Sequence, residues 1–407
     1  QLLHPTFFTR LPRVPTRIMN PADDPAELFV CGRLCLLGEH SDWAGGFRSA
    51  ARPDTVHVGR CVVVGTNDGL RARVSTSSGS DMCVAMTSTD DAGAKRSRVF
   101  DLYDDEALLR AARGGADAHD DGSGTFWRYV AGTLHHLIVS SPHADAIAAA
   151  LATKCVAIDN YETTLPMKKG LSSSAAACVL VVRAMSTACG LGLSAEEEME
   201  AAYLGERVTP SKCGRMDQAC AFGPGRLTLL TFDGETVDVK PLQKVGGDGV
   251  HVVVADLGAG KDTVRILDDL QRAYPTPRSD ADRELHALLG ENNSAVVDAA
   301  IVAIESGDAP GLGFVYQMAQ RGFDEIAGVA CPSQLGERGS PKLHEVLRCE
   351  KLKRAACGGK GVGSQGDGSV QFVCDGATRA AEVRAILKEE FGLADAMTIV
   401  IPPSTSA

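Results

Sequence analysis

Residues 165–177, Leu-Pro-Met-Lys-Lys-Gly-Leu-Ser-Ser-Ser-Ala-Ala-Ala, decide how the rest of this chain is interpreted. Residues 154–164 before them have the alternating, β-branched character of a strand, and the apolar run after them has helical length. Gly170 permits a tight turn, and the serines stand where a helix begins. Free N–H groups, hydroxyls and the positive end of the helix dipole converge there, so we predict a phosphate-binding loop.

The predicted loop differs from a Walker loop, because no Gly-Lys-Ser or Gly-Lys-Thr follows Gly170. A serine in the first helical turn can also reach a phosphate-bound Mg²⁺. The alternative is a helix cap of small residues that packs closely against a neighbour.

Composition limits the classes of protein to consider. A chain of 407 residues with 44% apolar and 23% charged residues predicts a globular protein of two domains. The net charge of −11 disfavours nucleic acid and anionic membranes, and we expect no apolar run of bilayer length. Thirteen cysteines without a Cys-x-x-Cys pair predict reduced thiols and a cytoplasmic location, with a targeting segment before Gln1 left open.

A polar cluster follows the predicted strand at 28–37. Glu39, His40 and Asp42 lie between that strand and the glycine pair at 45–46. Such groups are costly near a core unless they are hydrogen-bonded, as they would be to a polyhydroxylated ligand. A solvated turn is the alternative from these residues alone.

Several further elements are predicted from local patterns. The Thr-Asn-Asp-Gly stretch at 66–69 predicts a hairpin between strands 56–65 and 70–75, and residues 90–97 are predicted as a polar loop. Ser194 and Glu197 form a capping box that opens a helix reaching about residue 208. Near the end of this helix, Glu206 by itself is typical of an exposed glutamate.

A glycine-rich run at 357–368 precedes a predicted strand at 369–374. So many glycines before a strand predict a loop whose backbone approaches another group closely, although a flexible loop is the alternative. A second glycine-rich stretch, at 245–249, marks the predicted domain boundary, which gives domains 1–248 and 249–407.

These stretches resemble the motifs of the GHMP kinases, the superfamily of galactokinase, homoserine kinase and mevalonate kinase. Residues 165–177 resemble the second motif and 357–368 the third, while 31–46 are similar to the first galactokinase motif, with Cys35 in place of Asn and Trp43 in place of Tyr. Gly-Glu-Arg at 205–207 and Cys-Gly-x-Met-Asp-Gln at 213–218 also match this superfamily. The resemblance implies an α+β, two-domain GHMP kinase fold, with a ribosomal protein S5 domain 2-like N-terminal domain and a ferredoxin-like C-terminal domain.

The resemblance also implies a set of site residues. By role these are Asp217 and Arg33 for catalysis; Glu39, His40 and Asp42 for the substrate; Lys169, Gly170, Leu171, Ser172, Ser173, Ser174 and Ala175 for ATP; Gly361, Gly363, Ser364 and Gly366 for the third motif; and Ser174 and Glu206 for the metal. It hints, more weakly, that Lys261 and Thr263 border the substrate, and neither is included in the predicted site.

The implied activity is ATP- and Mg²⁺-dependent transfer of a phosphoryl group to a small molecule, with a monosaccharide favoured, as in galactokinase-like sugar 1-kinases. Lys168 and Lys169 stand where galactokinases carry small residues, so a uronic acid or a mevalonate-like acid stays open as the acceptor. A non-catalytic galactokinase-like sensor of sugar and ATP is the other alternative. The expected partners are ATP and the small-molecule substrate.

Overall fold

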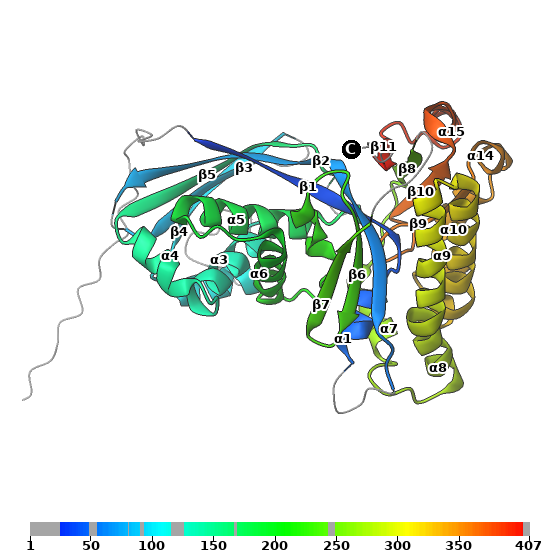
Figure 1. Ribbon diagram of the computed structural model, residues 1–407, viewed down its shortest axis with the longest axis horizontal. Coiled ribbons are helices and arrows are strands. Elements are labelled where there is room, and N and C mark those ends of the chain that lie inside the picture. The colour runs from blue at the N-terminus through cyan, green and yellow to red at the C-terminus, as the bar shows by residue number, and fades with distance from the viewer. Residues whose placement is uncertain are drawn as a thin grey trace, which may run out of the picture.

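The structure is a computed structural model that describes residues 25–48, 55–79, 81–89, 93–114, 126–166, 169–242 and 249–401. Within these ranges the first sheet has seven strands (Figure 1). In spatial order they are β4 (Lys95–Asp101), β3 (Cys83–Thr89), β5 (Lys154–Thr163), β2 (Gly59–Ser78), β6 (Leu227–Asp233) and β7 (Thr236–Pro241), with β1 (Ala26–Leu37) also paired to β2. Strand β4 begins in the stretch predicted as a polar loop, so that prediction was wrong from Lys95 onward.

Strand β2 runs straight through the predicted hairpin at 66–69, and that prediction was wrong. Neither Asp68 nor Gly69 has the positive φ that a two-residue hairpin turn needs. Instead, 66–68 bulge opposite Gly32 of β1, between the pairs Arg33–Gly65 and Cys31–Gly69. Here β2 exchanges β6 for β5 as its partner, so tertiary pairing overrides the local turn signal.

Helices α3, α4, α5 and α6 gather on one face of this sheet, whereas α1 lies apart from them against β2 and β6 (Figure 1). Helix α5 lies against β1 and β2, and α3 and α6 pack against α5. The bounds of these elements are α1 (Ser41–Gly46), α2 (Asp105–Arg113), α3 (Arg128–Val139), α4 (Ala144–Leu151), α5 (Ser173–Cys189), α6 (Ala195–Arg207) and the 3₁₀ helix η1 (Asp217–Phe222).

The capping box at the start of α6 is present as predicted. Ser194 Oγ accepts from the Glu197 N–H at 3.2 Å, and the Glu197 carboxylate accepts from the Ser194 N–H at 2.8 Å. Replacing Ser194 by alanine is expected to lower the free energy of unfolding by about 1 kcal/mol, because one N–H of the helix loses its partner. Urea unfolding measures this free energy. The control is Ser140→Ala, at the C-terminal end of the neighbouring helix α3, which should lower the free energy of unfolding by much less.

The second sheet has four antiparallel strands in the order β11 (Met397–Ile401), β8 (Val250–Asp256), β10 (Ser369–Cys374) and β9 (Gly358–Gly361). With helices between β8 and β9 and α15 (Gly376–Phe391) between β10 and β11, this is the βαββαβ pattern of a ferredoxin-like fold. The predicted loop 357–368 therefore includes a strand, β9, whose four residues lie in its first half.

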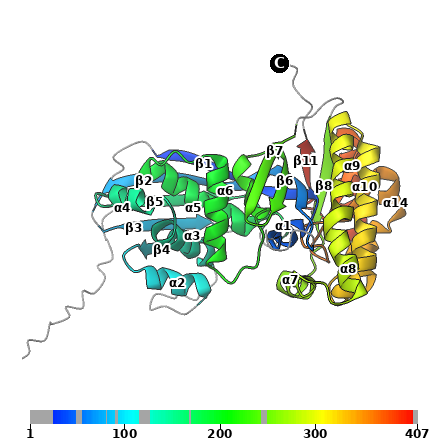
Figure 2. The same cartoon turned by 60° about the horizontal axis from the view of Figure 1, so that its bottom comes forward.

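The helices after β8 follow one another without long loops. They are α7 (Thr263–Gln271), α8 (Asp280–Ala287), η2 (Leu288–Asn292), α9 (Asn293–Ser306), α10 (Ala309–Gly322), η3 (Phe323–Ala327), α11 (Gly328–Ala330), α12 (Gly336–Gly339), α13 (Pro341–Leu347) and α14 (Glu350–Ala355). Helices α9 and α10 lie side by side in both views (Figures 1 and 2), and α10 packs on β9 and β10.

The continuous helical stretch 280–306 is long and apolar enough to span a membrane by length and composition, contrary to the expectation from the sequence. Its α9 segment nevertheless packs against β1, β2 and α10, with Val297, Ala300 and Ile304 buried. Because residues of α9 and β8 share one apolar cluster with those of the first sheet, the two sheets enclose a common core. The division at 248/249 stays a prediction.

Candidate active site

The predicted phosphate loop connects β5 to α5 through two residues in the left-handed region. Gly170 has φ 79° and Ser172 has φ 61°, and the second value is unusual for a residue with a side chain. The Arg33 N–H of β1 donates to the Leu171 carbonyl at 3.2 Å and fixes the loop on the sheet. The Ser172 side chain at the N-cap of α5 makes no capping hydrogen bond to the helix, so an anion can bind at this helix start.

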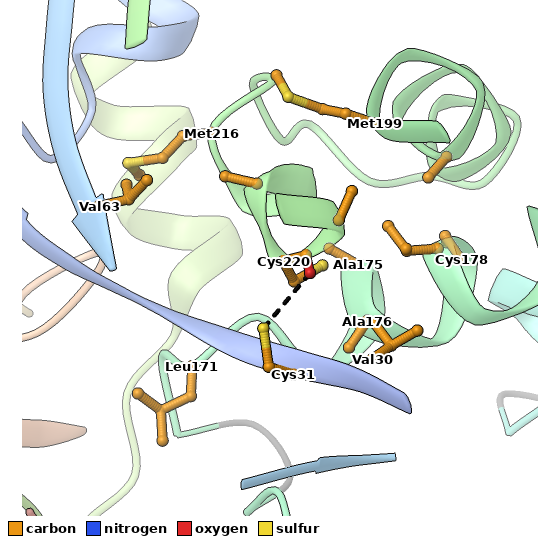
Figure 3. Close-up of a cluster of buried hydrophobic side chains, with 14 of the residues drawn as sticks. Val30, Cys31, Val63, Leu171, Ala175, Ala176, Cys178, Met199, Met216 and Cys220 are labelled. Atoms are coloured by element: carbon orange, nitrogen blue, oxygen red, sulfur yellow. Dashed lines mark hydrogen bonds between the residues drawn. The ribbon is translucent and has the colours of Figure 1, made fainter. Parts of the chain in front are cut away.

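Small residues behind the loop explain its close packing on the sheet (Figure 3). Ala175 and Ala176 are fully buried beside Cys31 of β1 and Cys220 of η1. The Cys31 thiol donates to the Cys220 carbonyl at 3.4 Å. The small-residue packing that the sequence offered as an alternative is therefore present together with the open helix terminus.

Ser174 and Glu206, the two predicted metal ligands, lie together. The Glu206 carboxylate is only 2% exposed and is hydrogen-bonded to the Ser174 hydroxyl. Gln218 Nε2 donates to it at 2.8 Å, and the Ser211 hydroxyl does so at 3.3 Å. Burial raises the pKa of Glu206, and these hydrogen bonds partly oppose the rise. The glutamate is thus not the exposed residue that its local sequence suggests.

Arg33 and Asp217, the predicted catalytic pair, are in direct contact. Arg33 Nη2 donates to Asp217 Oδ1, and the Ser172 hydroxyl donates to the same oxygen at 3.2 Å. The other two guanidinium nitrogens of Arg33, Nε and Nη1, are buried without a hydrogen-bond partner among the described residues. Unpaired buried donors are costly, so this arrangement fits an anion that would accept from them.

The donor set fits a magnesium-bound triphosphate. Mg²⁺ prefers oxygen ligands and is commonly held by one or two carboxylates together with phosphate oxygens. The Glu206 carboxylate and the Ser174 hydroxyl supply such oxygens beside the open N-terminus of α5.

Glu39 of the predicted substrate group has a partner that the sequence did not suggest. It forms an ion pair with Lys360 of β9, and both side chains are at most 2% exposed. The ammonium also donates to the Gly361 carbonyl at 3.0 Å and lies 5.4 Å from the centre of the Tyr316 ring. The only local signal for Lys360 is a charged residue within a glycine run.

Asp42 and His40 also have internal partners. Asp42 Oδ2 accepts from the Met216 N–H at 3.2 Å, directly before Asp217, so this carboxylate positions the loop that carries the predicted base. His40 Nδ1 accepts from the Trp43 indole at 3.0 Å, which leaves the proton on Nε2. Burial lowers the pKa of His40 to about 4, so the ring is neutral near pH 7.

The third motif meets the phosphate loop through glycines. A Cβ on Gly363, which has φ 63°, would lie 3.5 Å from Gly170 Cα, so the two loops touch through their backbones. Ser364 contacts the Thr263 hydroxyl at 3.3 Å. Two other predicted residues of this motif also have close neighbours. The Gly361 N–H donates to the Gln320 side chain at 2.7 Å, and a Cβ on Gly366 would lie 3.0 Å from the Gln334 carbonyl oxygen.

Lys169 is placed at the edge of this arrangement. Its ammonium forms a 2.6 Å ion pair with Asp256, and its carbonyl accepts from Ser369 at 2.8 Å. Lys168 lies outside the described residues. Within its described residues the structure thus brings the predicted motifs to one place. It adds Lys360 and Gln218, which lie outside the predicted set of site residues, although Gln218 ends the motif 213–218.

Comparison with known proteins identified one matching family. Residues 140–224, which contain the phosphate loop, Glu206 and Asp217, match the family described as GHMP kinases N terminal domain. This segment of the chain is similar to the GHMP kinases. A curated mevalonate kinase from Aeropyrum pernix is 30% identical over 159 residues, which are 39% of this chain and 46% of that relative, so the chain covers less than half the length of that relative.

The GHMP kinase fold extends over nearly the whole chain. Mevalonate kinase from L. major, solved with R-mevalonate, superposes with a TM-score of 0.61 at 17% identity and covers 96% of this chain and 100% of its own. Lactococcus lactis galactokinase, solved with galactose, superposes with a TM-score of 0.60 at 15% identity. This match covers 94% of this chain and 95% of the galactokinase chain. At these identities the likeness concerns the fold, and the α+β, two-domain GHMP kinase prediction is confirmed.

Proposed function

We propose that this chain transfers the γ-phosphoryl group of ATP to a hydroxyl group of a small molecule. The observation that carries the proposal is the contact of Arg33 and Ser172 with Asp217, at the phosphate loop that also presents Ser174 to Glu206. Carboxylate, guanidinium and open helix terminus are the groups that phosphoryl transfer requires.

Each residue then has a defined part in the reaction. Ser174 and Glu206 would hold Mg²⁺, which neutralises charge on the phosphates when bound. Arg33 donates its free N–H groups to the transferred phosphoryl group. Asp217 accepts the proton of the acceptor hydroxyl as the new O–P bond forms and the bond to ADP breaks.

A monosaccharide is the proposed acceptor, because Glu39, His40 and Asp42 follow the galactokinase pattern. A second candidate, a hydroxy acid of the mevalonate type, is favoured by a specific observation. The carboxylates of Glu39 and Asp42 are already engaged by Lys360 and by the Met216 N–H, so they are less available to sugar hydroxyls.

An acceptor panel tests the proposed function. We would incubate the full chain with Mg-ATP and D-galactose, other neutral monosaccharides, uronic acids, R-mevalonate or homoserine, and measure ADP release and the phosphorylated product. Turnover of at least one acceptor well above ATP hydrolysis is expected. Tight ATP binding without turnover of any acceptor would contradict the proposal and favour a non-catalytic sensor.

Replacing Glu206 by glutamine is expected to raise the Mg²⁺ concentration for half-maximal activity by at least about 10-fold, because an uncharged amide is a poor ligand for a hard cation. A magnesium titration of ADP release at saturating ATP measures it. Glu196→Gln, an exposed change at the other end of α6, is the matched control. An equal magnesium requirement in all three proteins would argue against Glu206 as a ligand.

A further inference from the structure

The ammonium of Lys261 lies between the two glycine loops of the site. Lys261 follows β8 and precedes α7, and its Nζ donates to the Val362 carbonyl at 3.2 Å. A Cβ on Gly170 of the phosphate loop would lie 3.6 Å from this Nζ, and a Cβ on Gly368 would lie 2.9 Å from it. Glycine at both positions therefore leaves room for the lysine head group beside the phosphate loop.

This cation has no anionic partner in the described part of the chain. Lys169 of the phosphate loop pairs with Asp256, whereas no ion pair joins Lys261 to any carboxylate in the described ranges. An ammonium has three donors, and among the described residues one acceptor, the Val362 carbonyl, is found for them. Burial and the nearby guanidinium of Arg33 lower the pKa of Lys261 to about 8, with Glu39 acting in the opposite direction.

The side chains of Lys261 and Arg33 both lie by the loop 170–172. Arg33 reaches it through Asp217 and Ser172, and Lys261 reaches it at Gly170. Arg33 and Lys261 are cations whose charge is not fully balanced by carboxylates, and both lie beside the N-terminus of α5. This arrangement suits the terminal phosphate of a bound nucleotide, which is its most highly charged part.

We propose that Lys261 is a further catalytic residue that, together with Arg33, contacts the γ-phosphoryl group during transfer. This inference rests on the proposed function and deepens it. If Lys261 bound the acceptor instead, its replacement would leave the affinity for the nucleotide unchanged.

Nucleotide binding tests the proposal without any acceptor. Calorimetry measures the affinities of Mg-ADP and Mg-AMP-PNP for the wild type, Lys261→Met and Lys261→Arg. The control variant is Lys351→Met, on α14 and far from the site. Lys261→Met should weaken AMP-PNP at least about 10-fold, as expected for one lost hydrogen bond between charged groups, and leave ADP within about twofold. Lys261→Arg should retain most of the preference. Equal weakening of both nucleotides, or no change in either, would overturn the proposal.

The pH dependence gives an independent readout. Because Lys261 is charged only below its pKa of about 8, the wild-type preference for AMP-PNP over ADP should decline above that pH, and that of Lys261→Arg should not. Within the described part of the chain, the other charged or titratable groups facing Lys261 are Arg33 and Glu39, with His40 nearby and neutral. A decline of equal size in Lys261→Arg would assign the titration to another group.

The acceptor assay separates the two possible failures. If the wild type turns over no acceptor but Lys261→Met still loses AMP-PNP selectively, the proposed function fails while the phosphate contact stands. If an acceptor is found, kcat and kcat/KM should fall together in Lys261→Met. A rise in the acceptor KM at unchanged kcat would place Lys261 on the acceptor and overturn the proposal.

Discussion

Replacing Asp217 by asparagine is expected to lower kcat by about 10²- to 10⁴-fold, the range typical of a lost general base. The amide keeps the shape of the side chain and one oxygen for Arg33 and Ser172, but it cannot take the acceptor proton. The affinity for Mg-ATP should change little, because Glu206 and the helix terminus are intact. Initial rates of ADP release with the best acceptor, together with ATP binding by calorimetry, measure both quantities.

The control is Asp298→Asn on α9, which removes an exposed carboxylate paired with Arg60 of β2. Its kcat should match the wild type. A kcat for Asp217→Asn within a few-fold of the wild type would show that Asp217 orients groups without accepting the proton. A comparison with Asp217→Ala would then separate orientation from proton transfer, since alanine also releases Arg33.

Replacing Lys360 by methionine is expected to lower the free energy of unfolding by about 3–5 kcal/mol, the usual cost of breaking a buried ion pair. Glu39, which is 2% exposed, would keep its charge without a partner. Urea unfolding at pH 7 measures the loss. Burial already raises the pKa of Glu39 above its ordinary value of 4.5. The destabilisation should therefore shrink as the pH falls from 7 and be smallest below 4.5, where the carboxyl group is protonated in both states.

The double variant Glu39→Gln with Lys360→Met is the matched control, because it removes both charges and keeps similar volumes. It should recover most of the stability lost in the single variant. A loss below about 1 kcal/mol in Lys360→Met, the range of exposed pairs, would show that the pair is open to solvent.

Local signals predicted much of the fold correctly. The strand before the phosphate loop, the start of α5 and the capping box of α6 depend on residues that are adjacent in sequence, and each is found where expected. The predicted hairpin at 66–69 was wrong because pairing with β1, β5 and β6 keeps β2 continuous there, and no local pattern reports those partners.

The sequence by itself determined the phosphate loop, because glycine, serine and the helix that follows act over a few residues through backbone geometry and free N–H groups. The tertiary structure decided which charged side chains are buried and which partners they pair with. Lys360 pairs with Glu39 across 321 positions, and Arg33 with Asp217 across 184. The burial of a charge depends on every element packed around it, so such pairs are determined only when β1, the phosphate loop and the second sheet come together.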